Sequence, residues 1–160
     1  MEDVRIRRFA PADSQWLVAR HQDLYTLEQG VDSSFGPAMA AVLQRYCESH
    51  DPACECGWVA VAGQRRIGSV FCIRQDDTTA RLRLFFLTPE ARGRGLGKKL
   101  LRDCMQFARH AGYREMMLKT HEKREKSGSL YAAFGWQAAA PRQVRIYGAD
   151  LLEQTWHVML

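Results

Sequence analysis

The segment from Leu87 to Leu101 reads LTPEARGRGLGKKLL, and it decides how the chain is interpreted. It starts at the end of an apolar stretch, passes through a turn with three glycines and continues into a helical pattern. Glycines let a backbone approach a ligand closely, and the free amide groups at the start of a helix bind phosphate oxygens. Arg92, Arg94 and Lys98 add positive charge beside those amides. The segment therefore predicts a binding site for a phosphate-bearing ligand.

Two better-known phosphate motifs do not fit this turn. A P-loop needs Ser or Thr after its Gly-Lys pair, whereas Lys99 follows Lys98 here. A dinucleotide fingerprint needs a third glycine where this chain has Lys98. The spacing that fits is Arg-x-x-Gly-x-Gly, formed by Arg92, Gly95 and Gly97.

The composition predicts one globular domain over residues 1–160. Hydrophobic residues make up 46% and charged residues 26% of the chain, and there is no repeat or low-complexity linker. The net charge of +5 suits an anionic partner without identifying it. Basic residues cluster at 92–99 and 119–126, so a nucleic-acid-binding module stays open as an alternative, ranked last.

The termini and cysteines predict a cytoplasmic protein. The first residues lack the apolar block of a signal peptide, and no apolar stretch is long enough to cross a bilayer. Five cysteines at irregular positions are typical of reduced thiols. Cys54 and Cys56 follow His50, but no second pair completes a tetrahedral set, so we expect no metal.

Apolar periodicity predicts an α/β (mixed α+β) fold with helices on both faces of a mixed sheet. Period two fails at Phe85-Phe86-Leu87, where we expect a bulge. Helices are predicted from Pro11 to a break at Gly30, over 35–46, from Leu96 to Gly112 and over 127–134. Strands are predicted at 4–9, 57–62, 67–74, 80–87, 116–120, 143–147 and 154–160.

On these features the chain resembles the GNAT acetyltransferase superfamily. The residues that carry the resemblance are the Arg-x-x-Gly-x-Gly motif, the preceding Thr88-Pro89-Glu90 turn, and the segments AGY at 111–113 and LYAAFGW at 130–136. Segments at 21–25, 51–52, 68–71, 80–83 and 154–156 look like the acetyltransferase half of bacterial MarR–GNAT fusion proteins. Because the chain begins almost at the first strand, we expect no MarR domain and do not carry over DNA binding.

The resemblance implies a central, mostly antiparallel sheet of six to seven strands with about four helices, and a site for acetyl-CoA. In the family the coenzyme A pyrophosphate lies on the glycine turn and the pantetheine arm pairs with the preceding strand. The residues this assigns to acetyl-CoA are Phe86, Leu87, Arg92, Gly93, Arg94, Gly95, Leu96, Gly97 and Lys98. Tyr131 occupies the position of the family's general acid, which protonates the departing thiolate; the alternative is an aromatic that only packs.

The proton acceptor is less defined, because Arg81 and Arg83 stand on the central strand where many relatives have an acid. The candidates are Glu28, His121 and Glu122. His121 and Gly128 also depart from the closest relatives, which have Asn and a helix without glycine there. If the family architecture holds, the acceptor pocket is lined by Tyr25, Glu28, Asp32 and Phe35, a set that suits a cationic amine.

We therefore expect transfer of an acetyl group from acetyl-CoA to a primary amine of a small molecule or protein, directly within a ternary complex. Cys104 falls in the apolar stripe of the long helix and is expected in the core, not as an acyl carrier. The alternative is an acyl-CoA sensor without turnover. A homodimer is left open.

Overall fold

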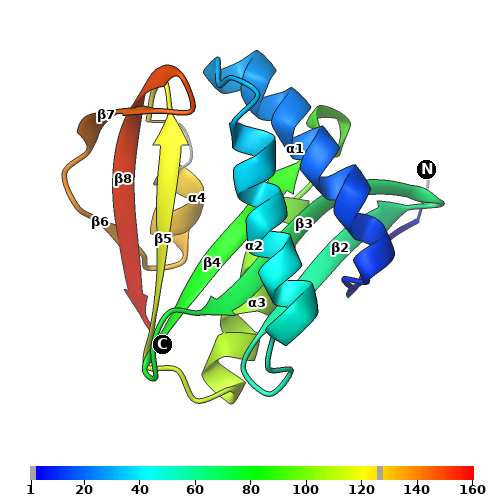
Figure 1. The fold of residues 1–160 in the computed structure, drawn as a ribbon. Helices are drawn as coiled ribbons and strands as arrows, with labels where there is room; N and C mark the ends of the chain where they lie inside the picture. The colour runs from blue at the N-terminus through cyan, green and yellow to red at the C-terminus, as the bar shows by residue number, and fades with distance from the viewer. Residues whose placement is uncertain (1–2, 126–127) are drawn as a thin grey trace.

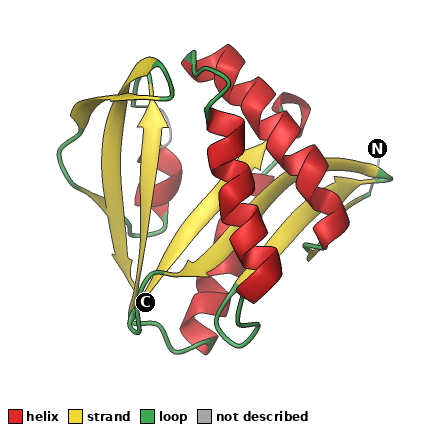
Figure 2. Ribbon diagram, viewed as in Figure 1, coloured by secondary structure: helices red, strands yellow, loops and turns green. Residues whose placement is uncertain are grey.

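The computed structural model describes residues 3–125 and 128–160, and helices cover both faces of its central sheet (Figures 1 and 2). Ser127, in the last predicted helix, lies outside the described residues. The first half consists of β1 (Val4–Arg8), a 3-10 turn (Pro11–Asp13), α1 (Ser14–Gln29), α2 (Phe35–Ser49), β2 (Cys56–Ala62), β3 (Arg65–Arg74) and β4 (Thr79–Leu87). The second half consists of a 3-10 turn (Pro89–Ala91), α3 (Leu96–His110), β5 (Glu115–Glu122), α4 (Gly128–Ala133), β6 (Gln137–Ala138), β7 (Arg142–Ile146) and β8 (Ala149–Met159).

The predicted mixed sheet is confirmed, with one strand more than expected. Over the described residues it has eight strands in the order β1-β2-β3-β4-β5-β8-β6, and β7 pairs with β8. Within that part of the chain β4 and β5 run parallel, while all other neighbours are antiparallel. The additional strand is β6, whose two residues are too few to show an alternating pattern.

The parallel pair opens into a gap along most of its length. Pairing between β4 and β5 covers only Thr79–Arg81 against Glu115–Met117, and the two strands then diverge (Figure 1). The C-terminal half of β4 consequently has β3 on one side and, among the described residues, no strand on the other. The glycine turn follows directly from this open end.

The predicted bulge is present in β4, one residue earlier than the aromatic pair suggested. The register with β3 shifts between Ser69 and Phe71, and Leu84 adopts a left-handed φ of 53°. The Ser69 hydroxyl donates a hydrogen bond to the Leu84 carbonyl oxygen at 2.6 Å, which holds the irregular backbone. Because of the bulge, Leu84 and Phe86 both pack on the α1–α2 side of the sheet, whereas Leu82 packs on the α3 side.

Each face of the sheet has its own apolar core. The helix α3 buries Leu100, Leu101, Cys104, Met105 and Ala108 against one face, and Cys104 lies in the core as expected. Helices α1 and α2 cover the opposite face (Figure 1). In α1, Leu17 and Leu24 are buried in this second core, whereas Leu27 is 79% exposed.

The β7–β8 hairpin reaches across to the helices. Its turn residues Tyr147 and Gly148 have left-handed φ values of 51° and 69°, as in a tight two-residue hairpin turn. The Tyr147 carbonyl accepts a hydrogen bond from the Asp32 amide at 2.8 Å, and its ring packs edge-on against Phe35. The hairpin tip and the α1–α2 loop thus meet beside the gap between β4 and β5.

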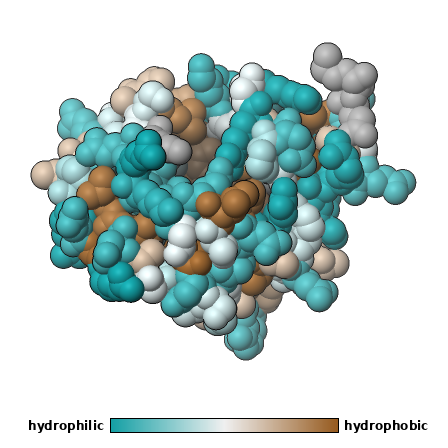
Figure 3. Space-filling model, turned by 90° about the horizontal axis from the view of Figure 1, so that it is seen from above, coloured by the Kyte–Doolittle hydropathy of each residue, from teal (hydrophilic) through white to brown (hydrophobic). Residues whose placement is uncertain are grey.

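The surface seen from above is mixed in character. Apolar side chains reach it in separate patches among hydrophilic ones (Figure 3). Across residues 3–125 and 128–160, none of the helices is both long and apolar enough to pass through a membrane.

Candidate active site

The glycine turn has the geometry of an anion site. Gly93 and Gly95 adopt left-handed φ values of 77° and 79°, which glycine tolerates best, and α3 starts at Leu96 immediately afterwards. The first amide groups of a helix have no partner within the helix and carry partial positive charge. A Cβ at Gly97 would come within 3.5 Å of Leu87 and 3.8 Å of Leu130, so the missing side chain keeps a passage open.

This passage belongs to a cavity of about 370 Å³, here called the first cavity. It runs from the glycine turn along the open edge of β4 to α4. It is lined by Tyr25, Glu28, Gln29, Phe85, Phe86, Leu87, Arg92, Gly97, Glu122, Leu130 and Tyr131.

The backbone of β4 offers hydrogen-bonding groups to the first cavity. The amide of Thr88 donates a hydrogen bond to the carbonyl oxygen of Ile67 on β3, and Phe86 is paired with Ser69, which also belongs to β3. In an antiparallel pair, the backbone N–H and C=O groups of successive residues point alternately toward the partner strand and away from it. The backbone groups of Leu87 and Phe85 therefore point away from β3 and into the gap. Of the two predicted backbone partners for pantetheine, Leu87 is therefore placed to bind, whereas Phe86 faces β3 and contributes its ring.

The charged residues of the turn lie in different places. Arg92 lines the first cavity and forms a bidentate ion pair with Glu28 at 2.6 and 2.9 Å, which raises the pKa of the Arg92 guanidinium. Arg94 and Gly95 line a separate hollow of about 200 Å³ on the other side of the turn, together with Leu96. Lys98 is exposed. The predicted phosphate residues thus surround the helix start from two sides.

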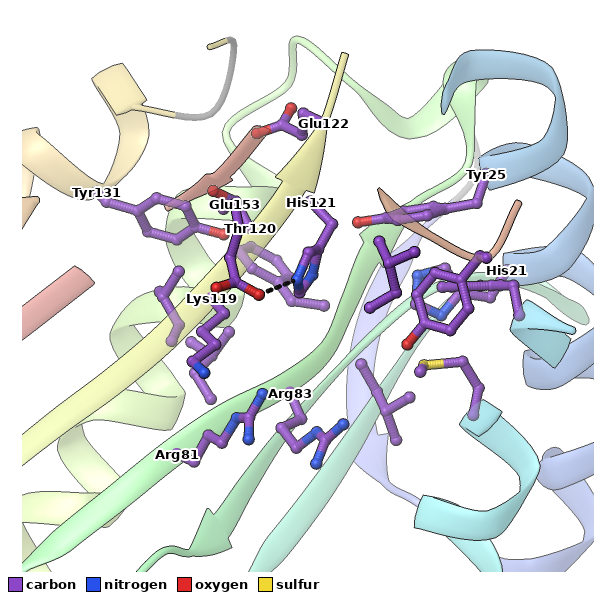
Figure 4. Close-up of a pocket in the computed structure, with 18 residues that line it drawn as sticks. His21, Tyr25, Arg81, Arg83, Lys119, Thr120, His121, Glu122, Tyr131 and Glu153 are labelled. Carbon is purple, nitrogen blue, oxygen red and sulfur yellow. Dashed lines mark hydrogen bonds and ion pairs between the residues drawn. The ribbon is translucent and has the colours of Figure 1, made fainter. Parts of the chain in front are cut away.

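A second cavity of about 340 Å³ lies across the gap, between β4, β5 and the α1–α2 side (Figure 4). Four residues line both cavities: Tyr25, Phe85, Glu122 and Tyr131. The remaining lining of the second cavity comprises His21, Phe35, Met39, Arg81, Leu82, Arg83, Leu84, Leu118, Lys119, Thr120, His121, Ile146, Tyr147 and Glu153. The two cavities therefore meet at two tyrosines, one phenylalanine and one carboxylate.

Tyr131 lies at this junction, although it is far from β4 in the sequence. Its ring packs against Trp136 and Trp156 with centroids 5.9 and 5.6 Å away, and it points from α4 into the site (Figure 4). Burial, followed by the nearby Tyr25 and Glu122, raises the pKa of Tyr131 well above its usual value of about 10. The phenol therefore keeps its proton at neutral pH, so packing and proton donation are compatible roles.

His121 is held by a carboxylate at the edge of the second cavity. Its Nε2 lies 2.9 Å from Oε2 of Glu153, whose other oxygen accepts hydrogen bonds from Arg142. The hydrogen bonds from His121 and Arg142 lower the pKa of Glu153 to about 2. Glu153 is consequently ionised throughout the neutral range and fixes the imidazole in place (Figure 4).

The other predicted acceptor-side residues divide into two groups. Tyr25 and Phe35 line the second cavity, with their rings stacked 4.6 Å apart, and Glu122 lines both cavities. Asp32 lines neither; it is exposed and accepts hydrogen bonds from the Ser34 amide and hydroxyl. Glu28 lines the first cavity beside Arg92, not the second. The second cavity therefore contains two of the four residues predicted to line the acceptor pocket, Tyr25 and Phe35, whereas Asp32 and Glu28 make contacts elsewhere.

Three residues of the second cavity were not predicted to line the acceptor pocket. His21 is buried with its ring stacked on Phe86 at 4.6 Å, and this burial lowers its pKa to about 3. Arg81 and Arg83 point into the cavity from β4, although they were read only as replacing an acid. Their alternation, two basic residues at i and i+2 in a central strand, was the available signal.

Comparison with known proteins agrees with this architecture. The model of the acetyltransferase (GNAT) family matches residues 18–136. The chain is 38% identical over 91 residues to N-acetyltransferase 8B from Homo sapiens, covering 52% of this chain and 40% of that protein. It spans about half the length or less of the curated relatives it matches first.

Solved structures share the fold over nearly the full chain. An acetyltransferase from Streptococcus agalactiae superposes with a TM-score of 0.77 and 23% identity, covering 100% of both chains. The protein yncA from Salmonella typhimurium, solved with its cofactor acetyl-CoA, has a TM-score of 0.72 and 21% identity, covering 99% of this chain and 94% of that one. With the family model covering most of its length, the chain belongs to the GNAT acetyltransferase family.

Proposed function

We propose that this protein transfers an acetyl group from acetyl-CoA to a primary amine, by direct attack within a ternary complex. The observation that carries the proposal is the meeting of two cavities at Tyr25, Phe85, Glu122 and Tyr131. One cavity leads to a phosphate-binding turn and the other opens on the opposite side of the gap. A thioester reached from one side and an amine from the other would come together at that junction.

The first cavity fits acetyl-CoA on features of this chain alone. The start of α3 provides amides for a pyrophosphate, the open edge at Leu87 provides backbone groups for an amide-containing arm, and Gly97 leaves the passage clear. Bound there, acetyl-CoA would supply an activated acetyl group. Arg92 would then exchange its exposed pairing with Glu28 for a phosphate, at little cost because exposed ion pairs are worth about 0–1 kcal/mol.

The junction supplies groups for both proton transfers. Tyr131 retains its proton and is placed to donate it to a departing thiolate. A backbone amide beside the Leu84 bulge is available to stabilise the developing oxyanion. For the amine proton, Glu122 at the junction and His121 held by Glu153 are the two acceptors that the site brings close; Glu28 is engaged with Arg92.

A covalent acyl-enzyme has no support in the described residues. Cys104 is fully buried in the α3 core, and that burial raises the pKa of its thiol well above the ordinary value. Thiols of this kind are inert because the thiolate is the nucleophile. Direct transfer is therefore the reaction that we propose.

The test is amine-dependent release of coenzyme A thiol from acetyl-CoA, measured over a matrix of both substrate concentrations. Direct transfer predicts intersecting initial-velocity lines, and parallel lines would instead indicate a covalent intermediate. Binding of acetyl-CoA without release for any amine would favour the acyl-CoA sensor. The dependence of kcat/KM on pH is then compared for Glu122→Gln and His121→Gln. The proton acceptor is the residue whose replacement removes the fall in kcat/KM at low pH.

Two finer parts of the proposal come from sequence alone. Kinship with the acetyltransferase half of MarR–GNAT fusion proteins rests on the short segments quoted above. A cytoplasmic location rests on composition and cysteine usage, and it is tested by fractionating cells that express the full-length protein.

A further inference from the structure

Two arginines on one strand give the second cavity a strongly basic wall. Arg81 and Arg83 are separated by one residue on β4, so their side chains leave the same face of the sheet. Both point into the cavity, and Lys119 approaches it from β5 (Figure 4). Arg81 and Arg83 are each partly buried, and each guanidinium lies within electrostatic range of the other.

These arginines are not neutralised by the part of the chain that the structure describes. Within residues 3–125 and 128–160 neither forms an ion pair, and Nε of Arg81 is buried without a hydrogen-bond partner. The buried carboxylate of Asp13, by contrast, is paired with both Arg7 and Arg66. A buried polar group without a partner is costly, which points to a ligand that completes the site.

The carboxylate of Glu153 does not pair with these arginines. Glu153 lies close enough to Arg81 to act on it electrostatically, but its oxygens are taken by His121 and Arg142. Burial lowers the pKa of Arg83 to about 10, with the adjacent Arg81 as the second cause. Both arginines therefore remain cationic at neutral pH, side by side and facing the same space.

The arginines lie at a defined place relative to the proposed chemistry. They line the second cavity but not the first, whereas Tyr131 and Glu122 line both. An acceptor in the second cavity would accordingly present its amine toward Tyr131 and Glu122 and its other end toward the arginines. Guanidinium groups match the planar geometry of a carboxylate and bind it with two parallel hydrogen bonds.

We infer that the acceptor is a small primary amine that also carries a carboxylate, and that Arg81 and Arg83 bind this carboxylate. The inference rests on the proposed function and narrows its substrate class. It replaces the expectation of an acceptor recognised by its positive charge alone. The aromatic side chains of Tyr25 and Phe35 leave room in the same cavity for the apolar part of such a molecule.

The experiment uses matched pairs of amines that differ only at the anionic end. Each amino acid, such as glycine, β-alanine and phenylalanine, is assayed beside its carboxamide for thiol release from acetyl-CoA. The parent protein is compared with Arg83→Gln, Arg81→Gln and, as an exposed control far from both cavities, Arg5→Gln on β1. The ratio of kcat/KM for carboxylate over carboxamide is compared between enzymes, so that differences in amine basicity cancel.

We expect the parent to prefer the carboxylates and each cavity variant to lose about 10- to 100-fold in kcat/KM for them, with the carboxamides changing less than about threefold. Arg5→Gln should retain the parent ratio. Thermal stabilisation by acetyl-CoA should be the same in all four proteins, which shows that a variant is folded.

Equal use of both members of every pair by the parent would overturn the inference, and the acetyltransferase proposal would stand. The same conclusion follows if the ratio is unchanged in a folded Arg81→Gln or Arg83→Gln. Should neither variant fold, the preference of the parent alone decides. Absence of thiol release with any amine would instead remove the proposed function, and the inference with it.

Discussion

Replacement of Tyr131 by phenylalanine tests the proposed chemistry at one atom. The ring contacts with Phe85, Trp136 and Trp156 are kept, and the structure shows no hydrogen bond from the hydroxyl within the described residues. The unfolding midpoint should therefore change little. The loss of a general acid should lower kcat by about 10²- to 10⁴-fold, which corresponds to about 3–5 kcal/mol in the activation free energy.

The matched control is Tyr113→Phe. Tyr113 is also buried, but its hydroxyl donates a hydrogen bond to the Cys54 carbonyl at 2.8 Å and lines neither cavity. Its loss should cost about 1 kcal/mol of unfolding free energy and leave kcat unchanged. Tyr131→Phe should therefore lower kcat without lowering stability, and Tyr113→Phe should lower stability without lowering kcat.

Single-turnover release of coenzyme A thiol, with saturating acetyl-CoA and amine, provides the rate, and calorimetry provides the stability. A Tyr131→Phe variant with a rate within about threefold of the parent would refute the assignment of Tyr131 as the proton donor. In that case the thiolate would have to leave unprotonated or receive its proton from water.

Further predictions concern the turn and the core. Arg92→Gln should weaken acetyl-CoA binding about tenfold at low salt and less at high salt, measured by calorimetric titration, while Glu28→Gln should not weaken it; equal weakening by both would contradict phosphate binding by Arg92. Asp13→Asn should lower the unfolding free energy by about 2 kcal/mol at neutral pH, because the buried carboxylate accepts hydrogen bonds from Arg7 and Arg66. Since Arg7 holds the pKa of Asp13 well below its ordinary value, the folded state gains this stability above pH of about 4 and loses it as pH falls further. Urea titrations between pH 2 and 7 should show a constant difference between the Asn variant and the parent above pH of about 5 and a difference that narrows below pH of about 4. A difference that stays constant down to the lowest pH would contradict the role of the Asp13 carboxylate.

The order of elements could be predicted because each segment carries its own local signal. The α3 stripe, the glycine turn and the Gly30 and Gly112 stops depend on residues close together in the chain. The gap between β4 and β5 could not be predicted, because it depends on pairing that stops after Arg81 and Met117, about thirty-five residues apart in sequence.

Site residues that belong to short sequence motifs could be predicted, whereas residues that long-range contacts bring together could not. Arg92 and Gly97 belong to a motif of short spacing, and Tyr131 was predicted from the resemblance to the GNAT family; all three line the first cavity. The alternation of Arg81 and Arg83 places both on one face of β4, but that this face lines a cavity depends on the distant Tyr147 and on residues of α1 and α2. Asp32 lines neither cavity for a different reason, because its side chain caps its own loop through Ser34.

Binding of acetyl-CoA at the glycine turn is tested most directly by thermal unfolding of the protein as acetyl-CoA is added, for the parent, Gly95→Glu and Gly112→Glu. The two glycines have similar left-handed backbones, with φ of 79° and 94°, and a Cβ at either would touch nothing within 4 Å. They differ in position, because Gly95 precedes the N-terminus of α3 and Gly112 follows its C-terminus. The same strain and charge are thus introduced at the proposed phosphate site and away from it.

We expect the midpoints of the parent and Gly112→Glu to rise with ligand concentration, which corresponds to about 2.7 kcal/mol of stabilisation at a hundred times Kd, and the midpoint of Gly95→Glu to stay unchanged. An equal rise in Gly95→Glu, or no rise in the parent, would contradict the claim that this turn binds the acetyl donor.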